Sequence, residues 1–481
     1  MGTSQLAGRG IDMVFTVILA RLLLPRDFGL LAMAALVATF LRIFASLGLG
    51  QRIVQRRDID EEYLSTVFWL NLAAGAVLCL ITAAFGRVIA GVMREPIVGV
   101  LVLVLSLRFL LAGWAAVQNA MLSRRMNYRV LALISLQAPI IGGLIGVGMA
   151  YAGAGVWSLV GQSLGEFVAT PILLYRATRW LPKPRFSWSK FMDAWSFGAP
   201  MVASRLLHYA VRNVDNLLIG RYLGSAALGF YALGYNVFLT PLSDIGVLVN
   251  RVMFSALSRL QDDNERLKRG FLMATQYVTL IALPMMVGIA LVAPVFVEVV
   301  FGAKWLPTAP VISILALAGF FQLMTTVGPS GLQAAGRPEL HLRFWILSLL
   351  VYLPAFIVGL RFGIVGVAAG YLIATCVLTP LQFRFVARAT GVTAGEMWDA
   401  IRAGVVGCAA MAAVVGPVSW MLRSTDLPKV VVLALLIALG ALVYGGLIWT
   451  VYRQTVLDLL KMARQVVPTS RRAALSGAGE V

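Results

Sequence analysis

Apolar residues follow one another along the chain in runs of about twenty, separated by short polar stretches rich in Arg and Lys. A run of that length is what an α-helix needs to cross the hydrocarbon core of a bilayer. The runs recur over all 481 residues, so the pattern predicts an all-α polytopic membrane protein with about fourteen transmembrane helices. The predicted spans are residues 4–24, 28–49, 64–85, 97–121, 130–151, 154–175, 194–220, 226–250, 271–292, 307–328, 342–360, 363–383, 401–421 and 429–450.

Two places depart from a simple series of spans. Four prolines (284, 294, 307 and 310) interrupt the ninth and tenth spans, and the segment VFVEVVFGAKW between them predicts an excursion along the membrane interface. The start, MGTSQLAGRGID, lacks the basic segment and apolar core of a secretory signal. We therefore expect no cleavable signal peptide and a first span that begins almost at once.

Lysine and arginine are unevenly distributed between the loops. The loops after even-numbered spans, together with the C-terminal tail, carry roughly three times as many as the loops after odd-numbered spans. Because cytoplasmic loops hold the excess of positive charge, these loops and both termini are predicted to be cytoplasmic. The basic and aromatic segment RATRWLPKPRFSWSK is expected to lie on the membrane surface, and YRQTVLDLLKMARQVV predicts an interfacial helix before a disordered end.

The sequence also shows an internal repeat. ARLLLPRDFGLLAMA (20–34) matches GRYLGSAALGFYALG (220–234), which aligns Arg21 with Arg221 and Gly29 with Gly229. An even number of predicted spans separates the copies, which favours two parallel repeats of six helices with a substrate site between them. The predicted organisation is an N-terminal bundle (1–176), a cytoplasmic linker (177–193), a C-terminal bundle (194–386), two additional transmembrane helices (387–452) and a cytoplasmic tail (453–481).

Composition excludes several classes of protein. Mean hydropathy is +0.87 and only 13% of residues are charged, whereas soluble domains have about a quarter. The net charge of +19 flanks the spans and forms no single basic face, so we expect no nucleic-acid partner. The cysteines Cys79, Cys376 and Cys408 lie in apolar spans without metal-ligand spacing. Without a nucleotide phosphate loop, a metal motif or a large extramembrane region, we expect no metal, no cofactor and no enzymatic activity.

Charged residues nevertheless occur inside the spans. The stretch RLLHYAVRNVDN (205–216) places its charged residues on one face of the seventh span, within about 100° of arc. The first span carries a similar face, and single arginines lie inside the second and fourth spans. The candidate site residues are Arg9, Asp12, Arg42, Arg108, Arg205, His208, Arg212, Asp215 and Asn216.

The cost of these charges decides where they point. Five arginines facing lipid would cost roughly 12–18 kcal/mol, at ~2.5–3.5 kcal/mol each, so they face protein or water. In one interpretation they form internal ion pairs, such as Arg9 with Asp12 and Arg212 with Asp215 or Asp244. In the other they line a hydrated cationic cavity, where arginine forks bind the phosphates of a substrate. The groups available there to a coupling ion or proton are Asp12, Asp215, His208 and Asp244.

Three stretches resemble a known family: GLGQRIVQRRDIDEEYLSTVFWLNLAAG, AMLSRRMNYRVLALI, and LPMMVGIALVAP followed by FGAKW. They resemble Wzx-type polysaccharide flippases of the multidrug/oligosaccharidyl-lipid/polysaccharide (MOP) superfamily, in the exopolysaccharide and lipopolysaccharide branch, which has MATE-like bundles. The resemblance extends over nearly the whole chain as a pattern of loops and glycines. Members usually have a short basic cytoplasmic segment before the first helix, and this chain departs from that pattern because Arg9 follows almost immediately.

The resemblance implies a function. A flippase of this kind moves an undecaprenyl-diphosphate-linked oligosaccharide from the cytoplasmic to the periplasmic leaflet of a bacterial inner membrane, by alternating access. It implies the lipid bilayer, a polysaccharide polymerase and chain-length proteins as partners. Two alternatives stay open: a MATE-like exporter of drugs or small molecules, and another membrane component of polysaccharide assembly, such as a polymerase or ligase. The arginines argue against an exporter of organic cations, and the short outer loops argue against a polymerase.

Overall fold

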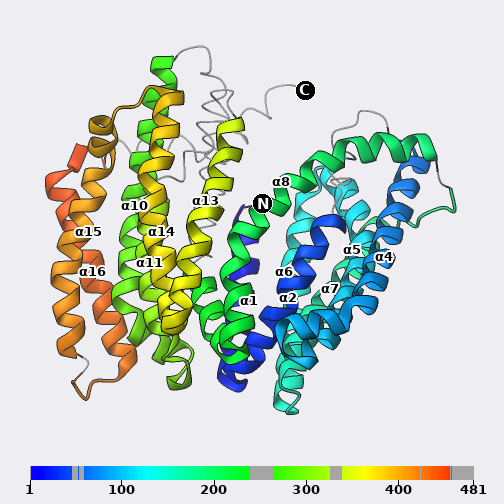
Figure 1. The fold of residues 1–481 in the computed structure, drawn as a ribbon, viewed down its shortest axis with the longest axis horizontal. Helices are drawn as coiled ribbons and strands as arrows, with labels where there is room; N and C mark the ends of the chain where they lie inside the picture. The colour runs from blue at the N-terminus through cyan, green and yellow to red at the C-terminus, as the bar shows by residue number, and fades with distance from the viewer. Residues whose placement is uncertain are drawn as a thin grey trace, which may run out of the picture. The chain divides into compact units, whose positions relative to one another are not determined.

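The computed structural model describes residues 2–45, 53, 59–185, 187–238, 264–324, 338–422, 424–454 and 457, which form helices joined by turns and short irregular segments (Figure 1). Within these ranges there is no β-strand. Eight helical stretches of the described chain are long and apolar enough to cross a membrane. The prediction of an all-α polytopic membrane protein is therefore confirmed. The number of fourteen spans and the six-helix repeat stay predictions.

Each of the first six predicted spans falls on a helix (Figure 1). The helix α4 shows how such an element begins and ends. The Asp60 carboxylate accepts a hydrogen bond from the Tyr63 N–H at 3.0 Å, and Arg94 ends the helix in the left-handed conformation with φ of 57°. The six helices are α1 (Gly2–Leu22), α2 (Pro25–Ala45), α4 (Glu61–Met93), α5 (Pro96–Arg124), α6 (Tyr128–Tyr151) and α7 (Val156–Thr178).

The later predicted spans also fall on helices as far as they are described. The eighth is helical over residues 225–238, and Asp244 lies outside the described residues. Pro284 and Pro294 lie inside α10 without ending it. The carbonyls that these prolines leave free accept side-chain hydrogen bonds, that of Leu280 from the Tyr444 hydroxyl at 2.6 Å and that of Ala290 from the Ser313 hydroxyl at 2.8 Å. The later helices are α8 (Trp188–Leu223), α10 (Asn264–Val300), α11 (Thr308–Met324), α13 (Pro338–Gly359), α14 (Gly363–Thr390), α15 (Ala394–Leu422) and α16 (Lys429–Val451).

The segment VFVEVVFGAKW completes one helix and forms a turn, and its predicted place at the membrane interface stays a prediction. Its first six residues complete α10, Gly302 turns the chain with φ of 97°, and a 3₁₀ helix, η1 (Ala303–Trp305), follows. The Trp305 side chain is fully buried and donates its Nε1–H to the Ala20 carbonyl at 2.8 Å. Its ring meets that of Phe28 edge-on at 5.2 Å. This segment is therefore a packed turn.

The segment after α7 is held against α4 and α5, and its predicted place on the membrane surface stays a prediction. Trp180 is buried in a cluster with Phe68, and the Gln118 side chain donates to its carbonyl at 3.3 Å. The Lys183 N–H donates to the Ser65 hydroxyl at 3.0 Å, and the Lys183 carbonyl accepts from Trp69 Nε1 at 2.9 Å. Residues 180–183 thus follow the first turns of α4 as a docked strap. The apolar packing of the Trp180 ring against Phe68 and the hydrogen bonds of the backbone groups explain this docking.

The chain divides into two compact units. Unit 1 consists of Met1–Asn236, Val300–Val311 and Leu342–Ala374. In it α4 packs on α5, α6 packs on α7, and α1 packs on α6. The contact between α6 and α7 is close because Gly142 and Gly146 face the carbonyl oxygens of Gln162 and Ser158, and small residues let helix backbones approach in a membrane. The predicted bundle limits stay predictions.

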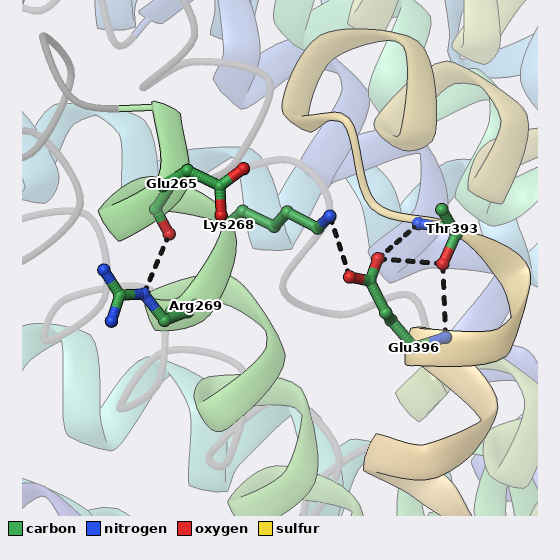
Figure 2. A network of polar contacts seen from close by, with 5 residues as sticks. All are labelled: Glu265, Lys268, Arg269, Thr393 and Glu396. Carbon is green, nitrogen blue, oxygen red and sulfur yellow. Dashed lines mark hydrogen bonds and ion pairs between the residues drawn. The ribbon is translucent and has the colours of Figure 1, made fainter.

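Unit 2 consists of Val237–Val299, Ile312–His341 and Thr375–Val481. Figure 2 shows how α15 begins in it: the Glu396 carboxylate accepts from the Thr393 N–H at 2.9 Å and from its hydroxyl at 2.8 Å. This is a capping box, and Lys268 of α10 forms an ion pair with the same carboxylate at 2.8 Å. On α16, the Tyr444 hydroxyl donates to the Leu280 carbonyl of α10 at 2.6 Å. The two additional helices are therefore fastened to α10.

Candidate functional site

Charged side chains from four helices of the N-terminal part of unit 1 lie near one another. Arg108 of α5 interacts electrostatically with Arg42 of α2 and with Glu166 of α7, and its guanidinium lies 4.7 Å from the centre of the Phe167 ring. Glu166 also interacts with Asp12 of α1. We call Asp12, Arg42, Arg108 and Glu166 the α5 charge cluster. It combines two arginines with two carboxylates inside helices that are otherwise apolar.

The α5 charge cluster contains three of the predicted site residues and one that sequence reasoning did not select. Asp12 and Arg108 are half-buried and Arg42 is exposed. Glu166 is half-buried too, and it was visible as the only acidic residue in the sixth predicted span. Ionisable residues inside membrane spans mark functional sites, which is the signal that points to Glu166. Arg9 lies exposed on α1.

A second polar group lies around Arg212 and Asp215 of α8. Asp215 is 1% exposed, and its carboxylate accepts from the Tyr231 hydroxyl at 2.9 Å and from the Asn216 N–H at 2.8 Å. Arg212 forms a side-chain hydrogen bond with Tyr235 and interacts electrostatically with Asp215. We call Arg212, Asp215, Tyr231 and Tyr235 the α8 tyrosine cluster.

Aromatic rings from α13 and α14 complete the surroundings of the α8 tyrosine cluster. The ring of Tyr235 lies 6.4 Å from that of Tyr371, and Tyr371 stacks on Tyr352 at 5.2 Å. Arg212 and Asp215 thus have partners inside unit 1. These contacts favour the internal-network interpretation for this pair, because buried charges are retained where hydrogen bonds satisfy them.

The other predicted residues of the seventh span have different surroundings. His208 is exposed, and its ring lies edge-on to that of Trp345 at 4.7 Å. Asn216 is half-buried, and its Oδ1 has no hydrogen-bond partner among the described residues. The side chain of Arg205 lies outside the described residues, although its backbone is part of α8. The predicted single charged face of α8 is therefore shared between buried and exposed surroundings.

Comparison with known proteins identifies the family. A family described as "Polysaccharide biosynthesis protein" matches residues 18–310. The teichuronic acid biosynthesis protein TuaB of Bacillus subtilis is 29% identical over 430 residues, which cover 88% of this chain and 89% of that protein. The lipopolysaccharide biosynthesis protein WzxC of Escherichia coli is 27% identical, covering 78% and 77% of the two chains. The succinoglycan biosynthesis transport protein ExoT of Rhizobium meliloti is 30% identical over 64% of this chain and 63% of its own.

Solved structures agree on the fold. The lipid II flippase MurJ, in an inward closed conformation, matches with a TM-score of 0.75 and 14% identity, covering 94% of this chain and 99% of its own. An inward-facing multidrug resistance MATE transporter of the MOP superfamily matches with a TM-score of 0.63 and 16% identity, over 81% and 96%. The resemblance to Wzx-type proteins is confirmed, the fold agrees with that of a MOP transporter, and the chain belongs to the polysaccharide biosynthesis protein family.

Proposed function

We propose that this protein is a flippase for a polyprenyl-diphosphate-linked oligosaccharide, working in the biosynthesis of a cell-surface polysaccharide. The family membership supports this, as do relatives named for lipopolysaccharide biosynthesis and for succinoglycan transport. The fold is that of a protein named as a lipid II flippase. We further propose a bacterial inner membrane location with both termini cytoplasmic, transfer towards the outer leaflet, and polymerase and chain-length proteins as partners.

The observation that carries the proposal is the α5 charge cluster. Arg42 and Arg108 lie near each other, and two guanidinium groups provide the planar donors that phosphate oxygens accept in pairs. In the free protein the Glu166 carboxylate interacts with Arg108, so a diphosphate has to compete with that carboxylate. The α5 charge cluster holds as many carboxylates as arginines, so an organic cation is the competing ligand that a test of the proposal has to include.

The site is tested by binding to the purified protein in lipid nanodiscs. The probes are a polyprenyl-diphosphate-linked oligosaccharide and, as a second ligand, an organic cation of the kind that drug exporters carry. We expect the diphosphate to bind and Arg108→Ala to weaken that binding by about tenfold to a hundredfold, the loss of one charged hydrogen-bonding group. Arg87→Ala is the matched control, because Arg87 is an exposed arginine of α4 outside the cluster. Binding of the cation and not of the diphosphate would contradict the proposal.

A further inference from the structure

The two copies of the aligned segment contact each other reciprocally. Gly29 of α2 lies against the carbonyl oxygen of Ser225, and Gly229 lies against the carbonyl oxygen of Pro25. A Cβ atom on either glycine would overlap that oxygen, and each would also lie within 3.1 Å of the backbone nitrogen of the other glycine. Residues 25 and 29 thus face residues 229 and 225. Such an exchange is the pattern of a contact around a two-fold axis, and all four residues belong to unit 1.

The aligned arginines beside this contact are also used reciprocally. The Arg21 Nε–H donates to the Val300 carbonyl at 3.0 Å, and Val300 is the last residue of α10. The Arg221 guanidinium donates to the Val92 carbonyl, in the last turn of α4. Carbonyl groups at a helix C-terminus have no partner within the helix, and a cation there is favoured by the helix dipole. Each arginine therefore caps the third helix of the other copy.

The loops that follow these third helices take part as well. After α10, the Lys304 ammonium donates to the carbonyls of Arg21 at 2.8 Å and Leu23 at 2.6 Å, at the end of α1. Burial lowers the pKa of Lys304, and the nearby Asp27 carboxylate opposes this. After α4, the Glu95 carboxylate accepts from the Ser225 hydroxyl at 2.7 Å. In both directions, the first loop of one copy meets the third loop of the other.

We propose that Arg21 and Arg221 are a matched pair of latches that hold this side of the transporter closed and release together in one opening step. The proposal rests on the proposed function, because a flippase has to open each side in turn. The latched loops follow odd-numbered predicted spans, so this side is the outer one. Opening this side separates residues 20–34 from residues 220–234. Because Gly29 and Gly229 hold the two backbones in close contact, the contact of Arg21 and that of Arg221 cannot open one without the other.

The test measures how often the latched contact opens. Cys79, Cys376 and Cys408 are replaced by Ala, and Leu228→Cys is introduced as a reporter, because Leu228 is fully buried beside Gly229. The protein is placed in nanodiscs, where both faces are accessible, and the rate of labelling by a polar thiol reagent is followed. No substrate is added, so the result does not depend on whether the protein flips a lipid-linked oligosaccharide.

Each latch contributes separately to one opening equilibrium, so the expected effects multiply. We expect Arg21→Ala and Arg221→Ala each to speed labelling about tenfold, and the double variant about a hundredfold. Arg87→Ala is the control, because Arg87 is exposed near the same end of α4 as Val92. Arg21→Lys, which keeps a donor, should label more slowly than Arg21→Ala. Single variants that label at the rate of Arg87→Ala, or a double variant no faster than either single one, would overturn the proposal.

A loss of folding is separated from a release of the latch by a second measurement. The thermal unfolding midpoint of each variant is recorded in the same nanodiscs. Latch variants should label faster at a temperature well below that midpoint. Faster labelling that appears only within the unfolding transition would also overturn the proposal.

Discussion

Arginine side chains in unit 1 are satisfied by three different kinds of partner. Arg108 lies over an aromatic ring and interacts electrostatically with a carboxylate, Arg212 forms a hydrogen bond with a tyrosine, and Arg21 donates to a carbonyl at a helix end. The first kind of partner exchanges easily for a phosphate, because both are oxyanions. The second and third hold helices in place. An arginine inside a span therefore does not by itself indicate a substrate site. The group that contacts the arginine decides whether it is available to a substrate.

The interaction of Glu166 with Arg108 leads to a prediction about affinity. Glu166→Gln removes a negative charge that competes with the substrate for the guanidinium, and keeps the shape of the side chain. We expect the variant to bind the diphosphate probe about tenfold more tightly, or ~1.4 kcal/mol, in a titration of the protein in nanodiscs. Glu298→Gln, on the half-buried Glu298 in the last turn of α10, is the control. Weaker binding by Glu166→Gln would show that this carboxylate is not a competitor.

The buried Asp215 leads to a prediction about stability. Tyr231→Phe removes the hydroxyl group that donates to the Asp215 carboxylate at 2.9 Å and leaves that carboxylate short of one hydrogen bond. We expect a loss of ~1–3 kcal/mol in the free energy of unfolding, seen as a lower midpoint in thermal unfolding. Tyr151→Phe, at a tyrosine that is 75% exposed, should leave the midpoint unchanged. Equal midpoints for the two variants would contradict the internal-network interpretation.

At the scale of elements, the docked strap determines how α8 leaves the first helices. Residues 180–183 contact α4 and α5 through the Trp180 ring and through backbone groups, and α8 begins five residues later at Trp188. Little free chain separates the strap from α8. The Ser187 N–H donates to the Thr66 hydroxyl of α4 at 3.2 Å, so the strap and the residue before α8 are both attached to α4.

Cleavage by trypsin tests the strap. Trp180→Ala removes a large buried side chain, at a cost of ~3–5 kcal/mol in similar sites, so residues 180–185 should detach from α4. We expect faster cleavage after Arg185 in the variant than in the parent protein, followed by mass spectrometry. Trp420→Ala is the control, because that tryptophan is 75% exposed. An equal cleavage rate in Trp180→Ala and the parent would mean that the ring does not hold the strap.

At the scale of the whole molecule, the sequence predicts helices better than it predicts contacts. Long apolar runs predicted the positions of the long described helices, because a helix in lipid has to be about twenty residues long. The repeat aligned Gly29 with Gly229, yet nothing local indicated that these residues touch. The surroundings of Arg212 depend on Tyr371, which is distant in sequence, and periodicity on α8 alone gives no information about it.

For the whole molecule we also predict which source of energy drives the transfer of the lipid. A diphosphate moving outward carries negative charge away from a negative interior, and each charge gains ~2.3 kcal/mol per 100 mV if it crosses the full field. Two charges gain roughly 4–5 kcal/mol at about 100 mV, which biases the distribution more than about a thousandfold. We therefore expect the membrane potential to drive transfer in the outward direction without ATP.

Flipping by the purified protein in vesicles tests this most directly. The vesicles contain a polyprenyl-diphosphate-linked oligosaccharide and a potential set by potassium and valinomycin, and the fraction of the lipid in each leaflet is followed. The account predicts that the protein moves the lipid without ATP and that reversing the sign of the potential reverses the favoured leaflet. A distribution that ignores the sign of the potential, or transfer that occurs only when ATP is added, would contradict it.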